Sequence, residues 1–84
     1  MDNNDHLIAS TNKVVGLKQT VRSIENGKAK LVYIASDADR RLIVKLKDLA
    51  NMHQVKYHMV DSMLELGKMA GLKIEASACC ILKD

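Results

Sequence analysis

The sequence has almost no aromatic residues and no proline. Tyr33 and Tyr57 are its two tyrosines, and phenylalanine and tryptophan are absent. Stacking of bases on an aromatic platform is therefore disfavoured, which argues against the common single-strand RNA modules. Neither proline nor a low-complexity stretch marks a linker, and 84 residues suffice for one modest core. We therefore expect a single domain over residues 1–84.

Long hydrophobic runs and an N-terminal cationic segment are also missing. Apolar residues make up 48% of the chain, yet no run approaches the ~20 apolar residues of a membrane span. Residues 1–5 are acidic and polar, whereas a signal peptide begins with a positively charged segment. The sequence therefore predicts a cytoplasmic protein with no membrane partner.

Residues that bind metals are few and poorly spaced. Cys79 and Cys80 lie in an apolar run. Neighbouring side chains of a strand point to opposite faces, so both thiols are expected to pack as small hydrophobic groups. Metal binding by this pair is the weaker alternative. His6, His53 and His58 lack the i, i+4 spacing of a helical metal pair. We therefore expect no metal site.

The acidic residues do not form a catalytic site either. Asp37 and Asp39 flank an expected helix start, where capping is the ordinary role of aspartate. Nothing near them in the sequence supplies a nucleophile or a metal ligand. The glycine motifs of dinucleotide-binding and P-loop proteins are absent as well. We assign no catalytic residue and no cofactor, and a small enzyme is the least favoured hypothesis.

Apolar periodicity predicts helices that alternate with strands. Helices are expected over residues 4–11 and 17–25, after a cap at Ser36 or Asp37, and from a Ser62–Glu65 capping box to Gly71. Strands are expected over residues 14–15, 31–35, 55–60 and 74–82. We expect three methionines to fill gaps in the core: Met59, Met63 and Met69. The alternation favours a layered α/β domain with helices on both faces of one sheet.

The most informative stretch is residues 14–28, where a short apolar run meets Gly16 and a helical pattern follows. Leu17, Val21 and Ile24 are spaced i, i+4 and i+7, so they share one buried stripe. The side chains that point the other way are polar or basic: Lys18, Gln19 and Arg22.

The start of this helix is suited to phosphate. Its first backbone N–H groups lack helical partners, and together with the helix dipole they favour an anion. Between Lys13 and Lys30 there are five basic residues against one acid, Glu25, and the formal net charge of the chain is +3. Clustered positive charge is the usual footprint of a nucleic-acid binder, and a solvated helix face is the alternative.

Three segments in order, residues 15–24, 27–39 and 66–74, resemble the kink-turn-binding ribosomal protein family of the L-seven-Ae type. The short length and the Lys18-Gln19 pair are similar to its small bacterial members. The resemblance implies a three-layer α/β/α sandwich with a four-stranded mixed sheet. It also implies a function without catalysis: the family binds a sharply bent RNA helix–bulge–helix with sheared G·A pairs and stabilises the bend.

The resemblance also implies two groups of RNA-binding residues. In the first, Gly16 allows close approach of the backbone, and Lys18 and Gln19 face the guanine edges at the G·A pairs. Arg22 faces a phosphate or a base. In the second, the loop of residues 72–74 covers a base turned out of the stack. The full set carried over is Gly16, Leu17, Lys18, Gln19, Arg22, Leu72, Lys73 and Ile74.

One departure from the family bears on binding strength. Its archaeal and eukaryotic members usually have Asn-Glu where this chain has Lys18-Gln19, and Lys where it has Arg22. We therefore expect stronger phosphate attraction and weaker discrimination of base edges. The expected partner is structured RNA, either ribosomal RNA in the large subunit or a messenger leader, and the protein is expected to be a monomer. The alternative function is a protein-interaction or ribosome-associated scaffold module with only non-specific RNA affinity.

Overall fold

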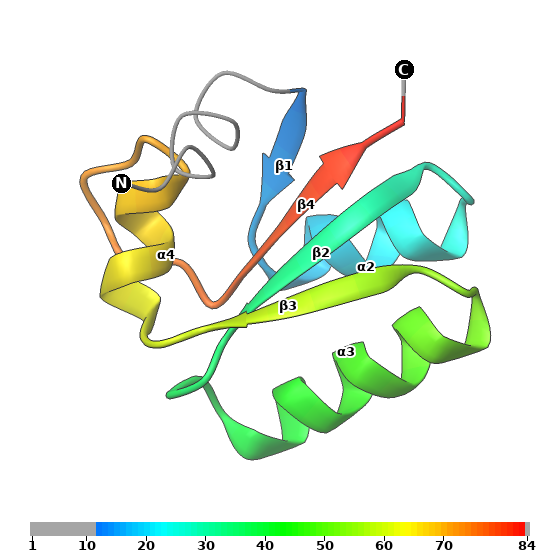
Figure 1. The fold of residues 1–84 in the computed structure, drawn as a ribbon, viewed down its shortest axis with the longest axis horizontal. Helices are drawn as coiled ribbons and strands as arrows, with labels where there is room; N and C mark the ends of the chain where they lie inside the picture. The colour runs from blue at the N-terminus through cyan, green and yellow to red at the C-terminus, as the bar shows by residue number, and fades with distance from the viewer. Residues whose placement is uncertain (1–11, 84) are drawn as a thin grey trace.

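The computed structural model describes residues 12–83, which contain three helices and a four-stranded mixed sheet (Figure 1). The helix predicted over residues 4–11 lies outside this range. The elements in chain order are β1 (Lys13–Val15), α2 (Leu17–Glu25), β2 (Ala29–Ala35), α3 (Arg40–Met52), β3 (Lys56–Val60), α4 (Met63–Met69) and β4 (Ala78–Leu82).

The strand order of the sheet brings all three helix starts to one end of the molecule. The order is β1-β4-β2-β3, with β4 antiparallel to both β1 and β2, and β2 parallel to β3. Strands β1, β2 and β3 therefore run in one direction, and β4 begins where they finish. Each of these three strands is followed by a helix (Figure 1). We call this end, where β1, β2 and β3 finish, the carboxyl end of the sheet.

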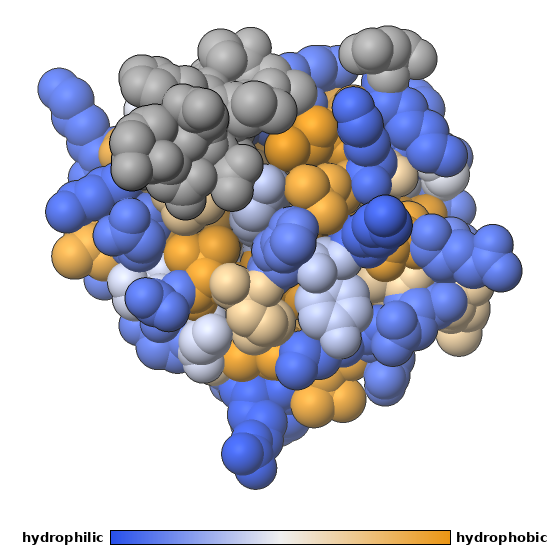
Figure 2. Space-filling view, viewed as in Figure 1, coloured by the Kyte–Doolittle hydropathy of each residue, from blue (hydrophilic) through white to orange (hydrophobic). Residues whose placement is uncertain are grey.

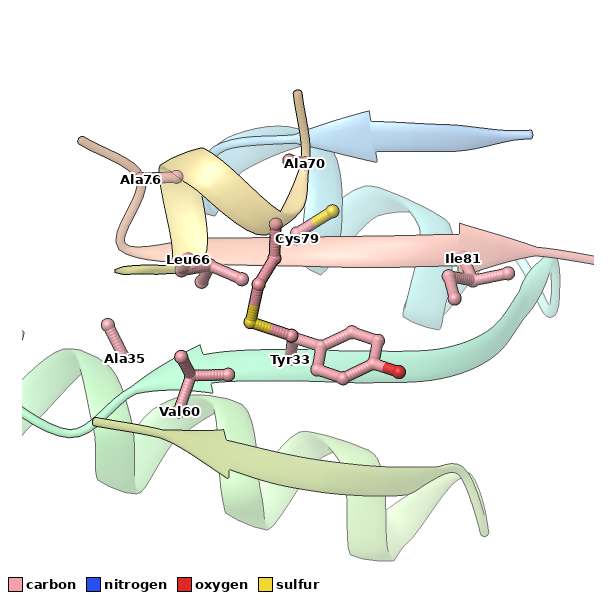
Figure 3. Close-up of a cluster of buried hydrophobic side chains, with 9 residues drawn as sticks. Tyr33, Ala35, Val60, Leu66, Ala70, Ala76, Cys79 and Ile81 are labelled. Carbon is pink, nitrogen blue, oxygen red and sulfur yellow. The ribbon is translucent and has the colours of Figure 1, made fainter. Parts of the chain in front are cut away.

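Helices cover both faces of the sheet, and each face has its own core. On one face, Ile24 of α2 and Leu46 of α3 pack with Val32 and Ile34 of β2. On the other, Leu66 of α4 packs in a cluster with residues of β2, β3 and β4, drawn in Figure 3. This alternation along β2 confirms the expected strand buried on both faces and the three-layer sandwich.

The predicted cap is wrong for one helix start, that of α3, and right for another, that of α4. Helix α3 is capped by Asp39, whose carboxylate accepts a hydrogen bond from the Arg41 N–H at 2.8 Å. The predicted cap at Ser36 or Asp37 is wrong, because the Asp37 carboxylate instead accepts from the Met63 N–H of α4 at 2.7 Å. The predicted Ser62 cap of α4 is confirmed, since its hydroxyl accepts from the Glu65 N–H at 3.0 Å.

Two further expectations need correction. The last strand begins at Ala78 and not at Ile74, because residues 74–77 turn back toward α4, where the Ala76 N–H donates to the Met63 carbonyl at 3.0 Å. Met59 is 40% exposed and does not fill the core, because it lies on β3 at the edge of the sheet. Met69 is buried, and Met63 packs against the same core cluster.

On the α4 side of the molecule, hydrophilic side chains project around the rim, and apolar residues are visible between them nearer the middle (Figure 2). Among residues 12–83, no helix is long and apolar enough to cross a membrane. The longest of them, α3, has 13 residues, whereas a membrane-spanning helix needs about 20.

Candidate nucleic-acid interface

Gly16 forms the junction between β1 and α2 at the carboxyl end of the sheet. Its φ of 106° lies in a region that residues with a side chain rarely adopt. Its N–H donates to the Ala78 carbonyl at 2.8 Å, which fixes the junction to the start of β4. A Cβ added to Gly16 would meet no atom of residues 12–83 within 4 Å. The glycine is therefore required by the turn, and the space in front of it is open to a ligand.

Helix α2 starts without a cap. No side chain of the described residues caps its first turn, and that turn contains no acidic residue. The first intrahelical bond is the one from the Thr20 N–H to the Gly16 carbonyl at 3.0 Å. The N–H groups of residues 17–19 come earlier and have no intrahelical acceptor. The positive end of the helix dipole is therefore not neutralised by a side chain of the described chain.

The polar side chains of α2 point away from the core. Lys18, Gln19 and Arg22 are exposed, whereas Ile24 is fully buried and Leu17 is half-buried against the same core cluster. Within the described range, neither Lys18 nor Arg22 is paired with a carboxylate. The three exposed side chains thus present two cations and one amide on the outer side of an uncapped helix.

The second predicted group of residues lies in the loop between α4 and β4. Gly71, with a φ of 79°, ends α4, and the Leu72 N–H donates to the Gly67 carbonyl at 2.8 Å. Leu72 is half-buried against the core beneath α4. Lys73 is exposed, and Ile74 is 69% exposed. Ile74 is therefore the apolar side chain of this loop that is free to meet a ligand, and Leu72 mainly supports the loop.

Backbone hydrogen bonds join the two groups at the carboxyl end of the sheet. Three successive residues, the last two before β4 and its first, bond to α4, to β2 and to the junction between β1 and α2. Ala76 bonds to Met63 of α4, the Ser77 carbonyl accepts from Ala35 of β2 at 3.0 Å, and the Ala78 carbonyl accepts from Gly16. The α2 start and the 72–74 loop are thus parts of one hydrogen-bonded end of the protein.

The basic residues that cluster in the sequence do not form one patch. Lys18 and Arg22 are on α2, but Lys28 and Lys30 follow the end of this helix and lie at the start of β2. There the Lys28 carbonyl accepts from the Lys83 N–H at 2.9 Å. Lys28, Lys30 and Lys83 are therefore at the opposite end of the sheet, and only part of the clustered charge is near the α2 start.

The two cysteines are buried in β4 and unbonded to each other. Burial raises the pKa of Cys80 to about 11 and also raises the pKa of Cys79. A thiol that stays protonated at neutral pH is a poor nucleophile and a poor metal ligand. Residues 12–83 contain no group of three or more side chains placed to hold a metal ion. His58 stacks on Tyr33, with 5.8 Å between ring centroids.

Sequence reasoning missed two residues that shape this end of the protein. Asp37 was assigned to the nearest helix, although its partner Met63 lies 26 positions away. Gly67 sits inside α4, where the backbone of Ile74 and Glu75 packs against it. A glycine inside a helical pattern was the available signal, since such a residue often marks a close backbone approach.

Comparison with known proteins gives the family. Residues 5–84 match the ribosomal protein L7Ae/L30e/S12e/Gadd45 family. An "RNA-binding protein" of Geobacillus thermodenitrificans is 43% identical over 70 residues, which cover 83% of this chain and 85% of the relative. The "RNA-binding protein YbxF" of Geobacillus stearothermophilus is 41% identical over the same length and with the same coverage.

Solved structures agree with this assignment. A protein of unknown function from Bacillus halodurans C superimposes with a TM-score of 0.85 at 26% identity, covering 96% of this chain and 82% of the other. The Giardia lamblia 15.5kD RNA binding protein superimposes with a TM-score of 0.84 at 24% identity, covering 96% and 68%, and shows the shared fold. The chain therefore belongs to the L7Ae/L30e/S12e/Gadd45 family and resembles its small bacterial members.

Proposed function

We propose that this protein binds RNA, that its target is a kink-turn with sheared G·A pairs, and that binding stabilises the bend. The observation that carries the proposal is the uncapped start of α2, with Lys18, Gln19 and Arg22 exposed on it. Membership of the family and relatives named as RNA-binding proteins support it. The protein acts in the cytoplasm as a monomer, on ribosomal RNA of the large subunit or on a messenger leader.

The α2 start supplies the contacts to the G·A pairs. Gly16 lets the backbone come close to the RNA, and the free N–H groups that follow it can bond phosphate oxygens. The Lys18 ammonium donates to guanine O6 and N7, and the Gln19 amide can donate or accept at a base edge. The Lys18 and Gln19 side chains are exposed in the protein alone, so neither has to leave the core before it meets RNA.

The 72–74 loop supplies the second contact. Ile74 is exposed and offers an apolar surface to a base turned out of the stack, and Lys73 beside it offers a positive charge to the phosphates. Leu72 holds the loop on the core. The two contacts together recognise the shape of a bent RNA, because a straight helix cannot reach both at once in the same way.

The experiment compares a kink-turn RNA with the same RNA in which the sheared G·A pairs are replaced by Watson–Crick pairs, at physiological salt. We expect much tighter binding to the intact kink-turn, since each lost base contact costs about 1–3 kcal/mol. Equal affinity for the two RNAs would contradict kink-turn recognition and leave a protein with general affinity for RNA.

A second candidate function, a protein-interaction module, is favoured by one observation. Val44 of α3 and Met59 of β3 line a shallow hollow together with the cations Arg40 and Lys47, and Val44 is 51% exposed. The hollow lies at the β3 edge of the sheet, whereas α2 follows β1, the strand at the other edge. This function would be favoured by a protein that co-purifies in stoichiometric amount after nuclease treatment and no longer co-purifies with the Val44→Glu variant. If the partner still co-purified with that variant, the hollow would not be its binding site.

A further inference from the structure

The 72–74 loop lies against α4 at a point where no side chain fits. A Cβ added to Gly67 would overlap the Ile74 carbonyl oxygen and would lie 3.0 Å from the Ile74 carbonyl carbon and 3.3 Å from the Glu75 Cα. All three are backbone atoms, so no side-chain rotation can relieve the overlap. The absence of a side chain at Gly67 therefore determines how closely the loop that carries Ile74 approaches α4.

The start of α4 is held from a distant part of the chain. The Asp37 carboxylate, in the loop after β2, accepts from the Met63 N–H at 2.7 Å. The Met63 carbonyl in turn accepts from the Ala76 N–H, and two residues later the Ala78 carbonyl accepts from Gly16. A continuous series of contacts thus runs from Asp37 through α4 and the end of the 72–74 loop to the start of α2.

We propose that Asp37 and Gly67 are positioning residues for RNA recognition, which affect binding by holding the 72–74 loop at its distance from Gly16. This inference rests on the proposed function. Gly67 is buried in α4 beneath the backbone of Ile74 and Glu75. Asp37 is exposed, and its carboxylate is engaged by Met63. Loss of either anchor leaves the α2 contacts intact and removes the contribution of Ile74.

A double-mutant cycle tests the role of Gly67. Affinity for the kink-turn RNA is measured for the wild type, Ile74→Ala, Gly67→Ala and the double variant. We expect Ile74→Ala to weaken binding about tenfold, from the apolar area it removes. Gly67→Ala should weaken it to a similar degree, and the double variant should be no weaker than Gly67→Ala alone. An Ile74→Ala loss that persists in full in the Gly67→Ala background would overturn the inference.

Asp37 offers a second test, which also serves if Gly67→Ala does not fold. Asp37→Asn removes the charge but keeps an oxygen that can accept from the Met63 N–H, whereas Asp37→Ala removes both. We expect Asp37→Asn to bind RNA at least as well as the wild type. Asp37→Ala should bind RNA several-fold more weakly. In the Asp37→Ala background, Ile74→Ala should cause no further loss of affinity. Equal changes in the two variants would show a charge effect and would overturn the positioning role.

The cycle separates failure of this inference from failure of the proposed function. If Ile74→Ala has no effect in the wild type, the second RNA contact is refuted and the positioning role falls with it. If the effect exists but is additive with Gly67→Ala, only the positioning role is refuted. Leu64→Ala is the control on α4, since Leu64 is 55% exposed and lies outside the series of contacts. Melting curves establish that each variant is folded.

Discussion

The three helices of residues 12–83 begin at the same end of the sheet, and among them only α2 begins without a side-chain cap. Asp39 caps α3, and Ser62 caps α4, whose first N–H is also taken by the Asp37 carboxylate. Helix α2 follows Gly16 and has no side-chain cap. Capping usually stabilises a helix by about 1 kcal/mol. Helix α2 lacks this stabilisation, and the N–H groups of residues 17–19 have no intrahelical acceptor and can bond to a ligand.

The charges around the three starts do not divide in the same way. Glu65 is in the first turn of α4, and Asp39 lies 4.0 Å from Arg41 at the start of α3. The first turns of α2 and α3 both lack an acid, and Lys18 is exposed at α2 just as Arg40 and Arg41 are exposed at α3. An anion is therefore favoured at α2 by both the dipole and the side chains, and is opposed by a carboxylate at the other two. Local capping, more than net charge, therefore distinguishes the helix start that we propose as the RNA contact.

The largest expected effect comes from making α2 resemble α4. Lys18→Glu places an acid in the first turn, and we expect affinity for kink-turn RNA to fall roughly 10–100-fold. The free energy of unfolding should stay the same or rise by up to about 1 kcal/mol, because the acid complements the helix dipole. Isothermal titration and urea unfolding measure the two quantities.

Lys83→Glu is the matched control for this change. It alters the charge by the same amount at the opposite end of the sheet, where the Lys83 N–H bonds to Lys28. We expect only a small loss of affinity from the general change in charge. If the two variants lose affinity equally, the comparison between helix starts has no bearing on RNA binding.

The reverse change removes the side-chain cap of α3. Asp39→Ala removes its cap and should lower the free energy of unfolding by about 0.5–2 kcal/mol. RNA affinity should be unchanged or slightly higher, since a carboxylate is lost and no RNA contact is assigned to α3. Urea unfolding and RNA titration of this variant are compared with those of Lys18→Glu. A loss of affinity as large as that of Lys18→Glu would place RNA at α3 as well.

A smaller effect sharpens the role of Arg22. If its exposed guanidinium bonds a phosphate, Arg22→Ala should reduce the salt dependence of binding by about one phosphate equivalent. The measurement is the slope of log K against log salt concentration for the wild type and the variant. An unchanged slope with weaker binding would assign Arg22 to a base, and an unchanged affinity would remove it from the interface.

The smallest effect concerns Cys80, which lies in the core cluster that packs against both α2 and α3. Burial raises the pKa of Cys80 from 9.0 to about 11, so the folded protein holds this proton more tightly than the unfolded chain. The resulting stabilisation is complete below about pH 9 and is lost as the pH rises toward 11. We expect the free energy of unfolding to decrease more steeply over this range in the wild type than in Cys80→Ala. If the free energy of unfolding decreased equally in the two proteins over this range, the raised pKa of Cys80 would be contradicted.

Features that depend on neighbouring residues were predicted well from the sequence. The helix over residues 17–25 is confirmed at both ends, because an apolar stripe and the flanking glycines determine it locally. The Ser62 cap and the end of α4 at Gly71 are confirmed for the same reason. The family resemblance added what the pattern alone left open, namely a four-stranded mixed sheet.

Features that depend on distant contacts were not predictable. Ser36, Asp37 and Asp39 can all cap a helix, and the choice among them depends on a hydrogen bond between Asp37 and Met63. Residues 74–77 directly precede the apolar run of β4 and were predicted as part of the same strand, but the contact with Gly67 and the bond to Met63 hold them against α4. The basic residues near Lys28 were grouped with Lys18 because sequence distance does not reveal which end of a helix each one occupies.

The most direct test of the account measures the bend itself. A kink-turn RNA carries a fluorescent donor and acceptor at the ends of its two helical arms, in buffer where the RNA alone is extended. We expect saturating protein to raise energy transfer in this RNA and to leave it unchanged in an RNA without G·A pairs. Binding of the intact kink-turn with no rise in energy transfer would contradict the claim that the protein stabilises the bend.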